Sequence, residues 1–388
     1  MNRNLPLISL AVLFGASVTA QSFQDLVDTR NGVHPYASIL QFEVGAIGTL
    51  ADGSGHSAGL EDEISWDSRI YYRDEAFGSR RGTFEAYAGR DGIFAGFTDG
   101  SMIGDDTLTR FEFHARPWMF YRDGFYAGDE LSQNGLFEGS DYEGYIGFGR
   151  PSPDGLYVEF GSYYRTLDFK SSDLTPAAYT LPEDYTAYGT RMYLEHRAVQ
   201  MDRRRGMPQQ GFVMTVIGER EWNDSDGEIG RVVGVRTRLP SAVWRARGRL
   251  EWYIPASDAT TWEVFVTGGM QDKKDRLQNS EGQRPLGSEW ADGSLRMRMH
   301  LGESFVVTPF ASFQYSKTAV PLGGGSSKDY FFGGGVEAFL HLGQSMSIHG
   351  WYSYLDNENR PSISIANDVR GQHMFYLGMV MRFGASRR

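Results

Sequence analysis

The chain has 388 residues, a formal net charge of −11 and no cysteine. The lack of cysteine excludes disulfides, cysteine metal sites, a thiol nucleophile and a lipid anchor on cysteine. The acidic balance argues against nucleic-acid binding, which depends on a basic surface.

The first twenty residues have the order of a cleaved export signal. Arg3 gives a basic start, an apolar core runs from Leu5 to Phe14, and Val18-Thr19-Ala20 forms a small-residue cleavage site. This apolar core is too short to cross a bilayer as a helix. We therefore divide the chain into an export signal at residues 1–20, a short lead or plug at 21–37 and one folded domain at 38–388.

From residue 38 onward, apolar and polar residues alternate with the period of two that is typical of β-strands. In Val243–Ile254, apolar residues take one face, while three arginines and a glutamate take the other. Leu295–Leu301 repeats this plan. Helical periodicity is hard to find anywhere in the chain, so the pattern predicts an all-β protein.

The alternating runs divide the folded domain into about sixteen expected strands. They span residues 38–50, 62–74, 82–90, 92–99, 106–118, 142–150, 155–168, 185–200, 209–222, one strand within 229–254, 259–271, 293–301, 304–316, 328–342, 344–355 and 371–383. A soluble sandwich with one wet face would alternate in the same way. The length of the strands instead favours an antiparallel transmembrane β-barrel.

Aromatic residues gather at the ends of these strands, as expected for a belt at a membrane interface. The clusters are Trp118, Phe120 and Tyr121; Tyr163 and Tyr164; Trp222; Trp252 and Tyr253; Tyr330, Phe331 and Phe332; and Trp351, Tyr352 and Tyr354. This distribution also favours the barrel over the sandwich.

The lengths of the connections provide a second test, because long and short connections alternate in transmembrane barrels. Counting back from the last strand, the long set is 356–370, 317–327, 272–292, 223–241, 169–184, 119–141 and 51–61. The tight turn Arg90-Asp91-Gly92 breaks the alternation. Pro240-Ser241 is a second weak point, because a turn there would divide the strand expected within 229–254.

The polar faces of the strands would point into the barrel, and they carry charges of both signs. The residues expected to line the interior are Arg69, Arg110, Glu112, Arg116, Arg191, Glu195, Arg197, Arg245, Arg247, Arg249, Glu251, Arg296 and Arg298. Unpaired charges in a dry interior are costly, so these groups must meet water or one another. Two interpretations follow: a water-filled pore that selects small hydrophilic or anionic solutes, and a salt-bridged network that fills the barrel. A ring of about sixteen strands leaves an aqueous channel unless loops block it, which favours the pore.

The sequence offers little for an enzyme. The strand histidines lie in no recognisable nucleophile motif, and the chain has no His-Glu-x-x-His, phosphate loop or Gly-x-Ser-x-Gly. The acidic run 223–228 lacks the ligand spacing of an EF-hand loop. We therefore expect no enzymatic activity, no cofactor and no metal site.

A turn before one strand carries a first resemblance to a known family. Residues 202–211 read D-R-R-R-G-M-P-Q-Q-G, which resembles the Asp…Pro-x-x-Gly turn of the Omp85 superfamily, the outer-membrane barrels that insert or export other proteins. Two departures weaken the resemblance. The long loop at 272–292 has Arg284-Pro285-Leu286-Gly287 where the family has Val-Arg-Gly-Tyr. We also expect no periplasmic POTRA domain, because the predicted barrel begins almost directly after the predicted export signal.

The last strand carries a second resemblance. In Q-H-M-F-Y-L-G-M-V-M-R-F, residues Tyr376, Gly378, Met381 and Phe383 follow the order polar-x-Gly-x-x-apolar-x-aromatic. This resembles the terminal β-signal by which Gram-negative outer-membrane proteins are delivered to the barrel assembly machinery. The five residues after Phe383 depart from the pattern, which usually ends on the aromatic residue.

These features together predict a protein exported by its signal peptide to the bacterial outer membrane, with 21–37 as a periplasmic lead or plug. The expected function is passive diffusion of small hydrophilic solutes. The alternatives are an Omp85-like barrel that acts in protein insertion or export, and a closed structural or adhesin barrel. The expected partners are membrane lipid and lipopolysaccharide, the assembly machinery and the solutes, without nucleic acid; the barrel could also form oligomers.

Overall fold

The computed structural model describes residues 36–51, 63–89, 92–104, 106–127, 130–172, 175–202, 207–225, 227–231, 236–272, 275, 277–279, 288–319, 326–343, 345–355, 367–368 and 372–386. The expected export signal and most of the lead at 21–37 lie outside these residues, and Tyr36 already belongs to the first strand. Within these ranges, no helix is long and apolar enough to cross a membrane.

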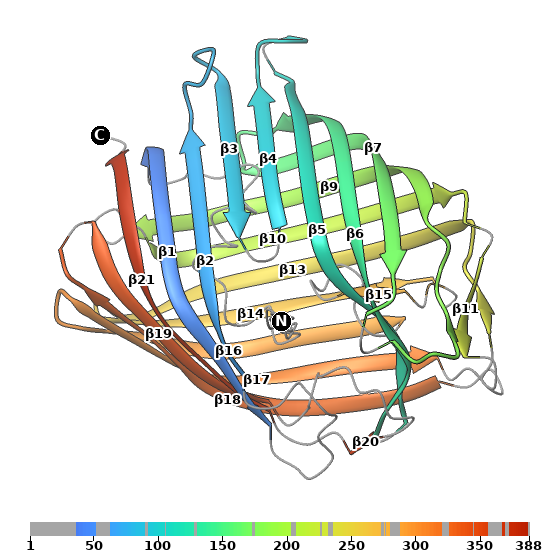
Figure 1. Ribbon diagram of the computed structural model, residues 1–388. Coiled ribbons are helices and arrows are strands. Elements are labelled where there is room, and N and C mark those ends of the chain that lie inside the picture. The colour runs from blue at the N-terminus through green and yellow to red at the C-terminus, as the bar shows by residue number, and fades with distance from the viewer. Residues whose placement is uncertain are drawn as a thin grey trace, which may run out of the picture.

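Sixteen long antiparallel strands form a closed β-barrel, which confirms the predicted fold and strand number (Figure 1). They are β1 (Tyr36–Ala51), β2 (Glu63–Asp74), β3 (Gly82–Gly89), β4 (Gly92–Asp99), β5 (Leu108–Ala127), β6 (Glu130–Pro151), β7 (Leu156–Lys170), β9 (Tyr185–Asp202), β10 (Met207–Asn223), β13 (Ala242–Ser257), β14 (Thr260–Gln271), β16 (Glu289–Leu301), β17 (Phe305–Ala319), β18 (Ser326–His341), β19 (Met346–Leu355) and β21 (Gln372–Ser386). Each pairs with the next along the chain, and β21 closes the ring by pairing with β1.

Five short strands belong to the connections. They are β8 (Tyr179–Thr180), β11 (Glu228–Arg231), β12 (Thr237–Arg238), β15 (Gln278–Asn279) and β20 (Asn367–Asp368). All five lie at one end of the barrel, which we call the loop end. The opposite end, where β1 begins and β21 finishes, holds short connections such as 258–259 and 302–304, and we call it the turn end.

Both weak points of the sequence argument are explained by the structure. β3 and β4 pair as far as Gly89 and Gly92 at the loop end, so the alternation of long and short connections holds in direction but not in length. Pro240 and Ser241 separate β12 from β13. Of these strands only β13 belongs to the barrel wall, because β11 pairs with β12 on one side and with β8 on the other.

The expected loop at 119–141 is wrong. These residues continue β5 and β6 as a paired hairpin up to Ala127 and Glu130, with irregular register after Arg116 and Asp123. The irregularities interrupt the period-two alternation, and Gly124 and Gly135 look like turn residues. The sequence pattern therefore does not predict these parts of β5 and β6, although the hydrogen bonds between the two strands stabilise them.

Burial in this molecule is reversed relative to a soluble protein. Trp66 and Trp118 are 82% and 74% exposed on the outer wall, whereas Glu159 and Gln41 are 0% exposed on the inner face. An exposed apolar wall over a charged interior is the arrangement of a barrel whose outer solvent is lipid.

The aromatic clusters at the strand ends do not all face outward. The inward members are Tyr121, Tyr163, Tyr253, Phe331 and Trp351, each with less than a tenth of its surface exposed. Neighbouring residues on a strand point to opposite faces, so a run of two or three aromatic residues cannot lie wholly on the outside. The expected membrane belt is therefore only partly correct.

Candidate functional site: the charged interior and the covered loop end

A chain of alternating charges runs across the inner face of β6 to β13. Arg165 on β7 contacts Glu143 on β6 and lies 3.2 Å from Glu221 on β10. Glu221 in turn lies 3.1 Å from Arg245 on β13. Arg191 on β9 joins the same chain, 2.9 Å from Glu143. Each side chain has less than a tenth of its surface exposed, so every charge here is neutralised by a neighbour rather than by bulk water.

A second chain of polar contacts closes the barrel on the other side. Arg296 on β16 contacts Glu337 on β18, and Glu337 lies 3.0 Å from Nε2 of His349 on β19. Nδ1 of His349 lies 3.1 Å from Glu43 on β1. Tyr376 on β21 donates a hydrogen bond of 2.9 Å to the same carboxylate. These contacts join β1 to β16, β18, β19 and β21.

A third group occupies the inner face of β2 to β7. Glu85 accepts hydrogen bonds from Tyr71 and Arg73, at 2.8 and 2.6 Å. Glu159 accepts from Arg110 at 3.1 Å and from Tyr145 at 2.6 Å. The inner wall is thus stiffened around the ring by carboxylates that accept from arginine and from tyrosine together.

Inward tyrosines lie flat over glycines of the wall. A Cβ atom on Gly45 would lie 2.6 Å from the Tyr376 ring, and one on Gly189 would meet the ring of Tyr163. The lack of a side chain on these glycines lets the ring cross to the next strand and place its hydroxyl on a carboxylate. This role of tyrosine was not predicted from the sequence, although the many Gly and Tyr residues at alternate positions were the available signal.

The thirteen predicted interior residues all lie on strands of the barrel wall, and most are already engaged there. Arg69, Arg197 and Arg249 have paired neighbours, Asp67, Glu195 and Glu251, two residues away on the same strand. Arg116 pairs with Asp141, Arg110 with Glu112, and Arg298 with Glu263. Arg247 is the exposed member of the set. That these residues line a conducting pore stays a prediction.

Short side chains face the interior beside Arg249. Thr215 and Thr267 pair with it from the two neighbouring strands. Further round the same wall, Ser294 pairs with Ser312 and Ser312 with Gly333. These short side chains lie in the arc from β10 to β18, which also carries the paired charges of Arg296 and Glu337.

At the loop end, on the side of β5 to β9, the barrel is covered by an apolar cluster. Tyr121, Phe137, Ile229, Leu239 and Leu277 are buried together with neighbours from β5 to β9. Their segments meet because β8 and β11 pair with each other and β15 pairs with β5.

Two connections from the far wall reach the long β5–β6 hairpin. Gln278 and Asn279, between β14 and β16, pair with Arg122 and Tyr121 of β5. Asn367 and Asp368, between β19 and β21, pair with Leu131 and Glu130 of β6. Figure 1 shows the hairpin bending across the loop end toward β20. The hairpin and its partners therefore span the mouth.

The wall is incomplete beside β3 and β4, the shortest strands of the barrel. β2 pairs with β3 only from Ile70 to Asp74, and β5 pairs with β4 only from Thr109 to Ala115. Toward the loop end, β2 and β5 each keep one edge that neither β3 nor β4 reaches; β15 occupies part of the edge of β5.

The residues of the predicted assembly signal divide between the two faces. Tyr376 and Gly378 face the interior, while Phe383 is 55% exposed on the outer wall, 6.3 Å from the ring of Phe42. The residues after Phe383 are part of the strand, because Gly384, Ala385 and Ser386 pair with β1. The tail that departed from the motif thus extends the β1–β21 seam.

The turn compared with the Omp85 superfamily is described only in part. Asp202 pairs with Met207 at the start of β10. Gly211 has a φ of 108°, and a Cβ there would clash with the Ala198 carbonyl, so glycine is required by the backbone. Residues 203–206 and 284–287 lie outside the described part of the chain. Within the described part, no group of three or more metal-ligating residues gathers.

In sequence, the chain matches no protein-family model and no curated protein. In structure, it is similar to CdiB from Acinetobacter baumannii, with a TM-score of 0.54 and 8% identity over 89% of this chain and 60% of that chain. It is also similar to BamA from Haemophilus ducreyi lacking POTRA domains 1-3, with a TM-score of 0.51 and 8% identity over 90% and 70% of the two chains.

CdiB from Escherichia coli gives a TM-score of 0.50 at 8% identity, over 88% of this chain and 63% of that chain. This chain therefore spans less than two thirds of the length of either CdiB chain. The similarity shows the fold, which is that of a bacterial outer-membrane β-barrel.

Proposed function

We propose that the protein is an outer-membrane pore for small hydrophilic solutes, exported by its N-terminal signal and inserted with the loop end outside. The observation that supports this best is the arc from β10 to β18. There Arg247 is exposed and Arg249, which pairs with Glu251 at 2.7 Å, keeps about a quarter of its side chain exposed, and both face the interior among threonine, serine and glycine. A cationic strip beside short side chains suits a water-filled path that prefers anions.

The experiment is single-channel recording in a planar bilayer with Arg247→Gln and Arg249→Gln, alone and combined. If the arc lines the path, the double variant loses preference for anions while the channel still opens. Arg245 is unsuitable for this test, because its replacement would remove an ion-pair partner of the buried Glu221 and destabilise the barrel. Arg150→Gln is the matched control, since Arg150 is 74% exposed at the turn end. Absence of channel steps from folded protein would reject the pore and favour the closed structural barrel.

A second candidate is an Omp85-like barrel that acts on protein substrates. It is supported by the similarity in fold to CdiB and BamA and by the glycine-dependent turn before β10. Depletion of the protein in cells separates the two candidates. An Omp85-like role requires other outer-membrane or exported proteins to be lost on depletion, whereas a pore requires only slower solute uptake.

A further inference from the structure

On the outer wall, a row of three polar residues crosses β7, β9 and β10 among apolar residues. Ser162 on β7 pairs with Thr190 on β9, and Thr190 pairs with Arg220 on β10. By strand alternation, all three point outward, on the face that also exposes Phe160 and Met192. Neighbouring strands are about 5 Å apart, so the two hydroxyls and the guanidinium lie within reach of one small group.

Aromatic residues place this row at the edge of the membrane. One step toward the loop end, Tyr164, Tyr188 and Trp222 form the adjoining row, 56%, 62% and 36% exposed. Outward aromatic residues at a strand end mark the level of the lipid headgroups. The polar row therefore lies just inside that level, on the side of the loop end.

Among the residues that the structure describes, no anionic side chain meets Arg220 on this surface. Its guanidinium lies over the Trp222 ring, 5.8 Å from the centroid. No carboxylate among the described residues forms an ion pair with it. Lys317, also outward near the loop end, differs in having Glu289 at 2.5 Å. An arginine that faces lipid is costly unless an anionic group meets it.

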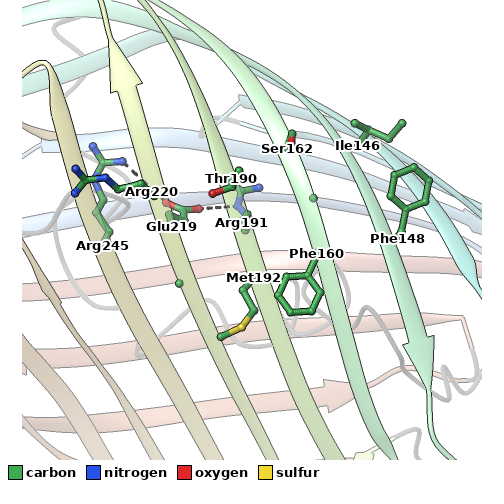
Figure 2. A pocket seen from close by; sticks show the side chains of 12 residues that line it. Ile146, Phe148, Phe160, Ser162, Thr190, Arg191, Met192, Glu219, Arg220 and Arg245 are labelled. Atoms are coloured by element: carbon green, nitrogen blue, oxygen red, sulfur yellow. Dashed lines mark hydrogen bonds and ion pairs between the residues drawn. The ribbon is translucent and has the colours of Figure 1, made fainter.

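A hollow adjoins the polar row on the side of the turn end. It has a volume of about 630 Å³; Phe148, Phe160 and Met192 form its apolar lining, and Arg191, Glu219 and Arg245 also line it (Figure 2). Gly218 completes that row, and a Cβ placed on it would have no neighbour within 4 Å. The apolar side of the hollow thus extends from the polar row toward the middle of the membrane, which is the direction that an acyl chain follows from its headgroup.

We propose that this surface binds an anionic, acylated lipid of the lipopolysaccharide class. Arg220 holds a phosphate of the headgroup, Ser162 and Thr190 donate hydrogen bonds to it, and an acyl chain occupies the hollow beside Gly218. Charge complementarity selects a phosphorylated lipid, and the position on the lipid-facing wall excludes a soluble ligand. The proposal rests on the membrane orientation proposed above, which places the loop end in the outer leaflet.

The test measures binding of purified hexa-acylated lipopolysaccharide to the folded barrel by native mass spectrometry. Arg220→Gln should weaken binding about tenfold, the loss of one charge-assisted contact. Gly218→Leu should weaken it as well, by filling the hollow without a clash. Lys317→Gln, the matched control at the same end, should bind as the wild type does. Dephosphorylated lipopolysaccharide should bind the wild type and Arg220→Gln equally.

Equal binding of intact lipopolysaccharide by the wild type and Arg220→Gln would overturn the site, and so would an equal loss in Lys317→Gln. Full competition by phosphatidylglycerol vesicles would overturn the assignment to lipopolysaccharide. Channel recording on the same preparations keeps the two proposals separate. Lost binding with unchanged conductance is the expected behaviour of Arg220→Gln, and a conducting barrel that shows no lipopolysaccharide binding would reject this site alone.

Discussion

Glu221 is the residue on which the interior depends most directly. Its carboxylate lies within 3.3 Å of donor atoms from Tyr163 and Arg165 on β7 and from Arg245 on β13. Removing one partner of a buried pair leaves an uncompensated charge, which costs about 3–5 kcal/mol. We expect Glu221→Ala to lower the free energy of unfolding by that amount, measured by urea titration of the barrel in lipid vesicles.

Asp106 provides the control for this experiment. It pairs with Arg150 at 3.2 Å, but both side chains are about three quarters exposed. An exposed pair contributes about 1 kcal/mol or less. If Asp106→Ala proved as destabilising as Glu221→Ala, the interior pairs would be solvated rather than buried.

Gly378 leaves room for the ring of Tyr376, whereas Gly218 makes room for no neighbouring side chain. A Cβ at Gly378 would meet the hydroxyl of Tyr376, which is held by Glu43, whereas one at Gly218 meets nothing within 4 Å. Gly378→Ala should therefore destabilise the barrel by about 1–3 kcal/mol through displacement of the ring. Gly218→Ala should stay within about 1 kcal/mol of the wild type. The same unfolding assay compares them, and equal effects would contradict this role for Tyr376.

At the scale of elements, the hairpin β5–β6 and its two partner strands can be tested by cross-linking. Antiparallel partners have Cα atoms about 4.5–5.5 Å apart, within the range of a disulfide. Because the chain has no cysteine, each introduced pair is unambiguous. Gln278→Cys with Arg122→Cys, and Asn367→Cys with Leu131→Cys, should oxidise in intact cells, as peptide mass spectrometry would detect. The mismatched pair Gln278→Cys with Leu131→Cys should remain reduced; its oxidation would mean that the hairpin is not held in this register.

The seam between β1 and β21 contains both the predicted assembly signal, which ends at Phe383, and the structural pairs that follow it. We expect deletion of Phe383 to abolish membrane insertion. The deletion removes the aromatic end of the sequence that resembles the terminal β-signal, and it shifts the register of the residues after it. Deletion of residues 384–388 should still allow insertion, but with lower stability, because only the pairs from Gly384 to Ser386 are lost. Membrane fractionation followed by heat denaturation distinguishes them. Insertion of the Phe383 deletion would reject the signal.

At the scale of the whole molecule, closure of the ring predicts unusual resistance to detergent. Closure of the ring by β1 and β21 leaves unpaired backbone edges in the described part of the wall only beside the short strands β3 and β4, so unfolding has few open edges from which to begin. The folded protein should migrate faster than the boiled protein on a gel in dodecyl sulfate and should be strand-rich by circular dichroism. Solubility without detergent, or migration that is independent of heating, would contradict a membrane barrel.

The sequence by itself determined the fold class, the strand number and the face of most strands. The reason is local: a strand exposes alternate residues to opposite sides. The alternation within Val243–Ile254 therefore places its arginines on one face whatever the neighbouring strands are. It failed between residues 119 and 141, where register irregularities remove the alternation, and at the aromatic pairs, where proximity to a strand end does not say which side a ring takes.

Only the tertiary structure decided which groups meet. Glu43 and His349 are 306 residues apart, and Arg165 reaches Glu221 across 56. The row Ser162, Thr190 and Arg220 likewise exists only through the register of three strands. Period-two alternation gives the face of a residue but not its neighbour, because register is set by the pairing of whole strands and by closure of the ring. The charges of the interior were therefore readable from the sequence, and their mutual neutralisation was not.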